Sequence, residues 1–281
     1  MMRLIRSMRE TIIAASTHNI KKPFVGWLRD IHSLGFRHLD VEFFKIIDEP
    51  YTIGNSVGRL KSIDGEAVQE LKHWVESNMI KVISFEAGSL LVDDDKRLRK
   101  SVARIREVIS TALLFKCPIV SVTPSSFKEN VSREDIVRSC RVLMDECGSY
   151  NVKLSLENGE VSSIKILRRP EDISYVIDKI GSPSLGICLD VAAAATIDFN
   201  IVSYISQFID YVDIIHINDV TKDLKFKNLI VGLGDLEFNP FMSIVKKHKI
   251  PLVIEIYSGY GPVDLFLCKR QIEKILHHVD C

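Results

Sequence analysis

The sequence of 281 residues has no excess of charge of either sign and no long hydrophobic run. Basic and acidic side chains number 37 each, so the chain lacks the strong positive field that nucleic-acid-binding proteins usually carry. No segment approaches the roughly 18 apolar residues that a membrane span needs. We therefore expect neither a nucleic-acid partner nor a membrane partner.

Cysteine pairing of the C-x-x-C type is also missing among the six cysteines, which argues against a zinc ribbon or a thioredoxin-type redox site. The start of the chain, Met1–Glu10, is basic, but the apolar run Ile12–Ala15 that follows is too short for the core of a secretory signal. We expect buried free thiols and a cytoplasmic protein.

Short β-branched runs alternate with amphipathic stretches of helical length along the whole chain. The expected strands are Thr11–Ser16, His38–Phe44, Ile80–Phe85, Ile119–Thr123, Lys153–Glu157, Leu185–Asp190, Val212–Ile217 and Leu252–Tyr257. The expected helices are Phe24–Leu34, Gly65–Asn78, Asp94–Phe115, Arg133–Tyr150, Pro170–Ile180, Ile201–Asp210, Pro240–His248 and Val263–His278. Eight such units predict an α/β fold with a parallel sheet closed as a (β/α)₈ TIM barrel; an open doubly wound sheet is the alternative.

No linker or low-complexity segment interrupts this series, so we expect a single TIM-barrel domain over residues 1–281. One irregular connection, about 45–63, follows the second strand and carries Gly54 and Gly58. In a barrel this insertion would lie over the active end, where long loops often serve as lids or bind substrate. An inert surface insertion is the other interpretation.

The last four expected strands each end in a side chain that ligates metals: Glu157, Asp190, His216 and Glu255. Aliphatic residues alternate with each of them, so the aliphatic side chains should face the helices and the candidate ligands should face the barrel axis. Barrel active sites form at this carboxyl end of the strands. Three buried carboxylates repel one another unless a cation neutralises them. The set predicts one divalent ion, Mn²⁺, Mg²⁺, Co²⁺ or Zn²⁺; polar rim residues held by hydrogen bonds and water are the alternative.

Other polar residues are expected near the same mouth. Asp40 and Glu42 share the inward face of the second strand and Glu86 ends the third, so they are candidates for binding substrate hydroxyl groups or for polar rim packing. His18, after the first strand, could face the pocket. Gly232 and Gly234 follow the seventh strand, where many barrels bind phosphate, although glycines there can also serve only a tight turn.

The chain resembles the xylose isomerase-like TIM barrel superfamily, the sugar phosphate isomerase/epimerase family, over nearly its whole length. The candidate ligands are spaced by 33, 26 and 39 residues. The motifs that carry the resemblance are GFRHLDV (35–41), LEN (156–158), GICLD (186–190), HIND (216–219), GLGDL (232–236) and IE (254–255). Individually these motifs are weak, but their order and spacing are typical of the superfamily.

The resemblance implies that Glu157, Asp190, His216 and Glu255 bind the ion and that Glu157 and Glu255 are also the catalytic acid/base pair. They would move a proton between adjacent carbons of a sugar through a metal-stabilised enediolate. It further implies that Asp219 orients a ligand or a substrate hydroxyl.

Two positions depart from the pattern of similar proteins. Ala193 stands where many carry a histidine three residues after the aspartate. Lys222 stands where many epimerase-like proteins carry an arginine six residues after the histidine; a lysine still offers charge and donors to a substrate, without the bidentate fork of arginine. Both differences concern substrate contacts, so the resemblance leaves the substrate open.

The leading functional hypothesis is a metal-dependent isomerase or epimerase of a small sugar or sugar phosphate. A dehydratase of a polyol ketone or dehydroshikimate-like acid would use the same metal and base. A nuclease of the endonuclease four type would need additional histidines, one of them at Ala193, and a non-catalytic sugar-binding barrel is the remaining alternative. Similar proteins often form dimers or tetramers, so a homo-oligomer is an open expectation.

Overall fold

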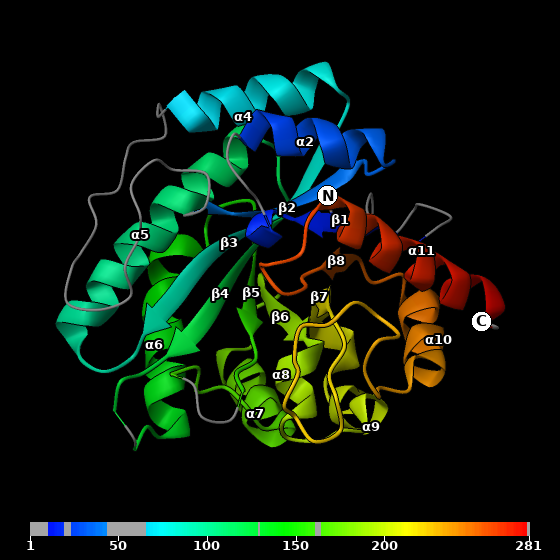
Figure 1. Ribbon diagram of the computed structural model, residues 1–281. Helices are drawn as coiled ribbons and strands as arrows, with labels where there is room; N and C mark the ends of the chain where they lie inside the picture. Colours follow the sequence, from blue (N-terminus) through cyan, green and yellow to red (C-terminus); the bar gives the residue numbers. More distant parts are fainter. Residues whose placement is uncertain (1–10, 20–23, 44–65, 129, 161–163, 280–281) are drawn as a thin grey trace.

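The strands of the computed structural model, which describes residues 11–19, 24–43, 66–128, 130–160 and 164–279, close into a barrel (Figure 1). Each strand pairs in parallel with the next one along the chain, and β8 closes the ring by pairing with β1. The strands are β1 Ile13–Ser16, β2 His38–Glu42, β3 Lys81–Leu91, β4 Ile119–Ser125, β5 Lys153–Glu157, β6 Leu185–Asp190, β7 Val212–Ile217 and β8 Leu252–Ile254. The predicted single-domain (β/α)₈ barrel is confirmed, and the open doubly wound sheet is excluded.

Helices surround the ring of strands (Figure 1). They are α2 Phe24–Ser33, α4 Glu66–Ser77, α5 Asp95–Leu114, α6 Arg133–Cys147, α7 Pro170–Ile180, α8 Val191–Ala195, α9 Ile201–Ser206, α10 Phe238–His248 and α11 Pro262–His278, with short 3₁₀ turns η1 Thr17–Asn19 and η2 Ile209–Tyr211. Within the described ranges, no helix combines the length and the apolar character needed to cross a membrane.

Local sequence signals explain where several helices begin and end. The side chain of Asp94 caps α5 by accepting a hydrogen bond from Arg97 N at 2.9 Å. Ser132 and Asp135 form a reciprocal capping box at α6, as their spacing predicts. Gly35, which follows α2, has a φ of +86°, a conformation that favours glycine over any other residue.

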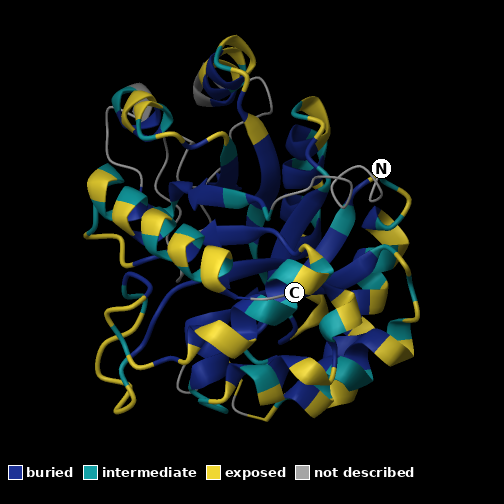
Figure 2. Ribbon diagram, turned by 90° about the vertical axis from the view of Figure 1, so that its right-hand side faces the viewer, coloured by how far each residue is buried: buried dark blue, intermediate teal, exposed yellow. Residues whose placement is uncertain are grey.

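The side chains of the barrel separate into an inner and an outer apolar cluster. A small group at the axis, away from the carboxyl ends of the strands, contains Ile12, Ala14, Ile83, Ile119, Cys188, Ile214 and Val253. The outer cluster holds the alternate residues of the same strands, among them Leu156, Leu189 and Ile215, packed against the helices. Figure 2 shows the buried strands enclosed by helices whose outer faces are exposed. The predicted inward and outward alternation of the last four strands is therefore confirmed.

Several element boundaries differ from the sequence-based prediction. β3 continues to Leu91 instead of ending at Phe85, because its pairing with β4 resumes after a register shift and runs from Ser89 to Leu91. β8 ends at Ile254, directly before Glu255. The expected helix Ile201–Asp210 is divided into α9 and η2, and α8 forms an additional turn after β6. The irregular connection about 45–63 lies outside the described residues.

Candidate metal centre and active site

Strand ends bring the four predicted ligands to one end of the barrel. Glu157 and Asp190 are the last residues of β5 and β6, His216 is next to last in β7, and Glu255 directly follows β8. Asp190 is the register partner of His216, and Glu255 N donates to Ile217 O at 3.2 Å, which continues the ladder beyond β8. The four residues therefore come from consecutive strands of the barrel.

Three of the four side chains meet at one point. Glu157, His216 and Glu255 each place a ligand atom within 4.8 Å of the others. His216 Nδ1 lies 2.5 Å from Glu255 Oε2 and 4.0 Å from Glu157 Oε1. Glu255 Oε2 and both ring nitrogens of His216 are nevertheless buried without a hydrogen-bond partner among the described residues. Buried polar atoms that converge on one point in this way fit a cation that takes the place of the close contact between His216 and Glu255.

Asp190 lies beside this trio. Its Oδ1 accepts hydrogen bonds from Ala193 N at 3.2 Å and from Asn218 Nδ2 at 3.3 Å, and it caps α8. Burial raises the pKa of Asp190 to about 6, against the opposing charge of Lys165. The charges of Glu255 and Glu157 also raise the pKa of Asp190, and that of His216 lowers it. The place of Asp190 as a fourth ligand stays a prediction.

His216 and Glu255 form a buried pair of opposite charge. Burial works against the ionised form of Glu255, but the charge of His216 holds the pKa of Glu255 well below its usual range. Burial likewise works against protonation of His216, yet the neighbouring Cys188 and Glu255 raise the pKa of the imidazole. A metal ion would take the place of the proton between these two side chains.

Glu157 is held through both carboxylate oxygens. Oε1 accepts from Lys165 Nζ at 2.9 Å, and Oε2 accepts from Thr123 Oγ1. Burial works against the charge of Lys165, but Glu157, Asp190 and Glu255 raise the pKa of its ammonium group. Sequence reasoning missed Lys165, because no motif marks a lysine in the loop after β5.

The backbone around Lys165 explains how a residue of this loop lies so close to Glu157. Lys165 forms an antiparallel bridge with Ser125 at the end of β4, and Ile166 N donates to Pro124 O at 3.0 Å. On the other side Gly159 passes so near that a Cβ atom there would lie 2.7 Å from Lys165 Cβ. The ammonium position is therefore set by two neighbouring strand ends.

Two asparagines connect the strand ends that carry the candidate ligands. Asn158 pairs with the backbone of Asp190, accepting from N at 2.7 Å and donating to O at 3.0 Å. Asn218 accepts from Ala192 N at 2.8 Å and donates to Glu255 O at 3.2 Å. Both asparagines stand in the sequence motifs LEN and HIND, which is the signal that could have identified them.

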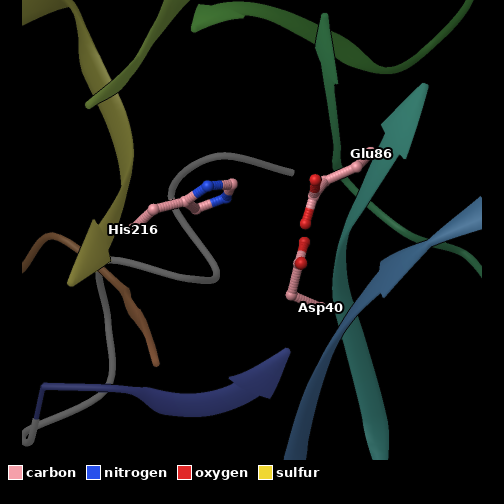
Figure 3. Close-up of side chains that lie close together, drawn as sticks. All are labelled: Asp40, Glu86 and His216. Atoms are coloured by element: carbon pink, nitrogen blue, oxygen red, sulfur yellow. The ribbon is translucent and has the colours of Figure 1, made fainter. Parts of the chain in front are cut away.

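A second group of ionisable side chains lies across the barrel. Asp40 on β2, Glu86 on β3 and His216 on β7 also place ligand atoms within 4.8 Å of one another, and their polar ends point together (Figure 3). Burial raises the pKa of Asp40 and that of Glu86, and the charge of Asp40 raises the latter further. These two residues are expected from the sequence to bind substrate hydroxyls, and that role stays a prediction.

The third predicted rim carboxylate, Glu42, pairs with His18. His18 Nδ1 lies 3.2 Å from Glu42 Oε2 and 3.9 Å from Glu255 Oε1. His18 therefore lies against the candidate site.

Asp219 organises the loop after β7. Its carboxylate accepts hydrogen bonds from Gly232 N at 2.8 Å and Gly234 N at 2.9 Å, as well as from Val220 N and Leu236 N. The N–H groups of both glycines are thus engaged by a carboxylate instead of being open to a phosphate. The side chain of Lys222 is exposed on the same loop. The expected substrate roles of Asp219 and Lys222 have no contact in the structure that supports them and stay predictions.

Together, the closed barrel and the acid and histidine groups at its carboxyl end define a (β/α)₈ barrel with a candidate ion site at its mouth. The chain belongs to the family of xylose isomerase-like TIM barrels, whose model matches residues 28–267.

Two curated relatives show the range of activities among similar sequences. An inosose isomerase of Halalkalibacterium halodurans is 24% identical over 212 residues, 71% of each chain. A probable endonuclease 4 of Mycoplasmopsis pulmonis is 27% identical over 153 residues, which is 48% of this chain and 55% of that protein. The match to the endonuclease thus spans about half the length of either protein.

Solved structures share the fold at low sequence identity. A D-tagatose 3-epimerase-like protein superimposes with a TM-score of 0.78 at 17% identity, covering 95% of this chain and 98% of the other. An L-ribulose 3-epimerase gives 0.75 at 13% identity, covering 95% of each. An IolI protein with a bound zinc atom gives 0.71 at 13% identity, covering 96% and 99%.

Proposed function

We propose that this protein is a divalent-metal-dependent isomerase or epimerase of a small sugar or sugar phosphate. The convergence of Glu157, His216 and Glu255 at the barrel mouth, with buried and unpartnered polar atoms, is the observation that carries the proposal. The inosose isomerase among the relatives and the sugar epimerases among the similar structures support the substrate class.

The donor set fits a divalent ion. Glu157, His216 and Glu255, with Asp190 beside them, offer carboxylate oxygens and one imidazole, a mixture suited to Mn²⁺, Co²⁺ or Zn²⁺ and less strongly to Mg²⁺. A bound divalent ion would polarise the substrate carbonyl and offset negative charge developing on its oxygens. Asn158 and Asn218 would keep the ligand-bearing strand ends in register.

Glu157 and Glu255 are the proposed acid/base pair. Glu157 ends β5 and Glu255 follows β8, with β6 and β7 between them, so their carboxylates approach from different sides of the mouth. One carboxylate removes the proton from the carbon next to the carbonyl; the electron pair of the broken C–H bond forms the C=C bond of the enediolate, and the π pair of the carbonyl moves to its oxygen. The other carboxylate returns a proton to the opposite face of the same carbon, which epimerises the sugar, or to the former carbonyl carbon while the neighbouring hydroxyl proton passes to the former carbonyl oxygen, which isomerises it.

Deuterium exchange tests this proposal directly. Metal-free protein would be supplied separately with Mn²⁺, Co²⁺, Zn²⁺ and Mg²⁺ and incubated in deuterated water with a panel of ketoses, ketose phosphates and inososes. We expect metal-dependent incorporation of deuterium next to the carbonyl, lost in Glu157→Gln and Glu255→Gln and retained in Glu146→Gln on the outer face of α6. Loss of water from the substrate would instead establish the dehydratase, and binding of a sugar without exchange would establish a non-catalytic barrel.

An endonuclease of the type four class is a second candidate, because part of the chain is similar to probable endonucleases. Ala193 occupies the place of a histidine in the pattern of that class, and His216 is the one histidine in both candidate ligand groups found among the described residues. A duplex with a single abasic site would be included in the same assay. Metal-dependent cleavage of that duplex without deuterium exchange on any sugar would replace the isomerase proposal.

A further inference from the structure

A cavity of about 530 Å³ lies at the amino ends of strands β1 to β4. Its other walls are the carboxyl ends of α4 and α5. The candidate metal centre lies at the carboxyl ends of the strands, so the cavity is at the opposite end of the barrel. Sites for small molecules usually have volumes of about 300–1,000 Å³, so this cavity is large enough to hold one.

Apolar side chains form the inner wall of the cavity. They are Ile12, Val75, Ile80, Val82, Ile83 and Phe115. Ile12 and Ile83 also belong to the small apolar group at the barrel axis, and they remain 8% and 5% exposed, whereas Ala14 of the same group is fully buried. The cavity therefore opens part of the barrel interior to water. A hydrocarbon group bound there would remove this apolar surface from water, which is favourable.

Basic side chains line the same cavity. Lys72 Nζ lies 3.9 Å from Glu76 Oε1, while Lys81 and Lys116 are exposed and form no ion pair with any described residue. The carboxyl ends of α4 and α5 add about half a negative charge each. Three ammonium groups outweigh these two helix ends and the carboxylate of Glu76, so an excess of about one positive charge remains.

His38 adds a polar group without a charge. Burial, together with the charge of Lys81, lowers the pKa of His38 to about 4, so its imidazole is neutral near pH 7 and can form a hydrogen bond at the wall of the cavity. The lysines disfavour a cationic ligand, and the inner wall offers few polar partners to a sugar. A purely apolar ligand would leave the lysines without a counter-charge. A ligand with one apolar and one anionic part matches both features.

We propose that this cavity binds a small amphipathic anion, namely a hydrocarbon chain with one carboxylate or phosphate head group. The chain packs against the apolar inner wall, and the head group binds the ammonium groups of Lys81 and Lys116 at the opening. Lysine suits this place because its aliphatic stem covers apolar surface while its charge stays in water. The site shares no residue with the candidate metal centre, so it does not depend on the proposed isomerase activity.

Isothermal titration of the full-length, metal-free protein with straight-chain carboxylates below their micelle concentrations tests the apolar part. From hexanoate to decanoate we expect the affinity to rise about fourfold for each added methylene group, the usual effect of burying one. Decanol has the chain without the charge, and acetate has the charge without the chain. Both should bind more weakly than decanoate.

Variants test the basic part. The double variant Lys81→Gln/Lys116→Gln should weaken decanoate about tenfold and abolish its advantage over decanol. Lys100→Gln is the matched control, because it removes an exposed lysine of α5 far from the cavity and should bind decanoate as the wild type does. Val75→Phe fills the cavity and should abolish the binding of both ligands. Thermal unfolding would verify that each variant is folded.

Three results would overturn the proposal. An affinity that does not change with chain length would mean that carboxylates meet only surface charge. Equal binding of decanoate and decanol by the wild type would mean that the lysines recognise no anion. Binding that appears only after removal of residues 2–10 would assign the cavity to the amino-terminal segment of the chain instead of to a separate ligand.

Discussion

Lys165 Nζ lies 2.9 Å from Glu157 Oε1, so the carboxylate proposed as metal ligand and base already has a cation against it. Thr123 occupies the other oxygen of the same carboxylate. A divalent ion that binds Glu157 must therefore share the carboxylate with Lys165 or displace its ammonium group. Either way, the positive charge of Lys165 works against that of the ion.

Removing the charge of Lys165 should raise the affinity for the ion and lower the rate of exchange. In Lys165→Met we expect Mn²⁺ affinity to rise about tenfold, equivalent to about 1.4 kcal/mol, because the repulsion is gone. We expect the exchange rate at saturating metal to fall, since Glu157 loses a donor that orients it. Competition with a fluorescent chelator would measure the affinity. Lys165→Arg keeps the charge and should stay near the wild type; weaker binding in Lys165→Met would show instead that Lys165 prepares Glu157 for the ion.

The sequence could predict the positions of Glu157, Asp190, His216 and Glu255 because strand periodicity is a local property. A residue between two aliphatic neighbours in a buried parallel strand must face the other way, and β5 to β8 obey this rule. Lys165 could not be found in this way. Its place depends on the bridge to Ser125 on β4 and on the fold of the loop that brings Gly159 against it, and strand periodicity reports neither contact.

Two other differences between the sequence-based prediction and the structure result from tertiary contacts. β3 extends beyond Glu86 because it shifts register against β4, and nothing in the run around Glu86 marks that shift. Asp219 has a carboxylate, as the candidate metal ligands have, but its loop folds back so that backbone N–H groups donate hydrogen bonds to it. Residue type therefore identified Asp219 as a candidate, but the packing of its loop decided which groups its carboxylate binds.

Asn218 should be a positioning residue for the ion. It joins Ala192 N, Asp190 Oδ1 and Glu255 O, so Asn218→Ala frees two strand ends that carry ligands. We expect Mn²⁺ affinity to fall by about tenfold to a hundredfold, the usual effect of losing a group that supports metal ligands. Isothermal titration would measure this. Ser203→Ala, on the exposed face of α9, is the control and should bind as the wild type does; equal affinities in the two variants would contradict the role.

Asp93 should make stability depend on pH. It joins the loops after β3 and β4 by accepting hydrogen bonds from Ser126 Oγ at 2.6 Å and Phe127 N at 2.8 Å. Burial works against its charge, but these hydrogen bonds lower the pKa of Asp93. A lowered folded-state pKa stabilises the fold above the unfolded-state pKa, and that contribution is lost as pH falls through the folded-state value.

Asp93→Asn should therefore destabilise the protein at neutral pH by about 1–3 kcal/mol, and by less in acid. Urea unfolding at neutral pH and near pH 3 would give the two differences in the free energy of unfolding. Asp94→Asn is the matched control, because asparagine also caps a helix and should keep the stability of α5. A difference that stays the same at both pH values would show that the charge of Asp93 has no part in it.

Gly159 offers a test of the loop that positions Lys165. A Cβ atom at Gly159 would lie 2.7 Å from the carbonyl carbon, the carbonyl oxygen and Cβ of Lys165, and backbone atoms cannot move aside cheaply. We expect Gly159→Ala to destabilise the protein by about 1–3 kcal/mol, the usual range for an overpacked site. Because the displaced segment carries Lys165, the same variant should bind Mn²⁺ more tightly, as Lys165→Met does.

Gly261→Ala is the control for this pair of effects. The nearest atom to a Cβ at Gly261 is 3.9 Å away, so the added methyl group has room and should change neither stability nor ion affinity. Unfolding in urea and chelator competition would be measured on both variants. If Gly159→Ala lost stability but kept wild-type affinity, the lysine would reach Glu157 without help from the loop, and the ammonium position would be set by Glu157 itself.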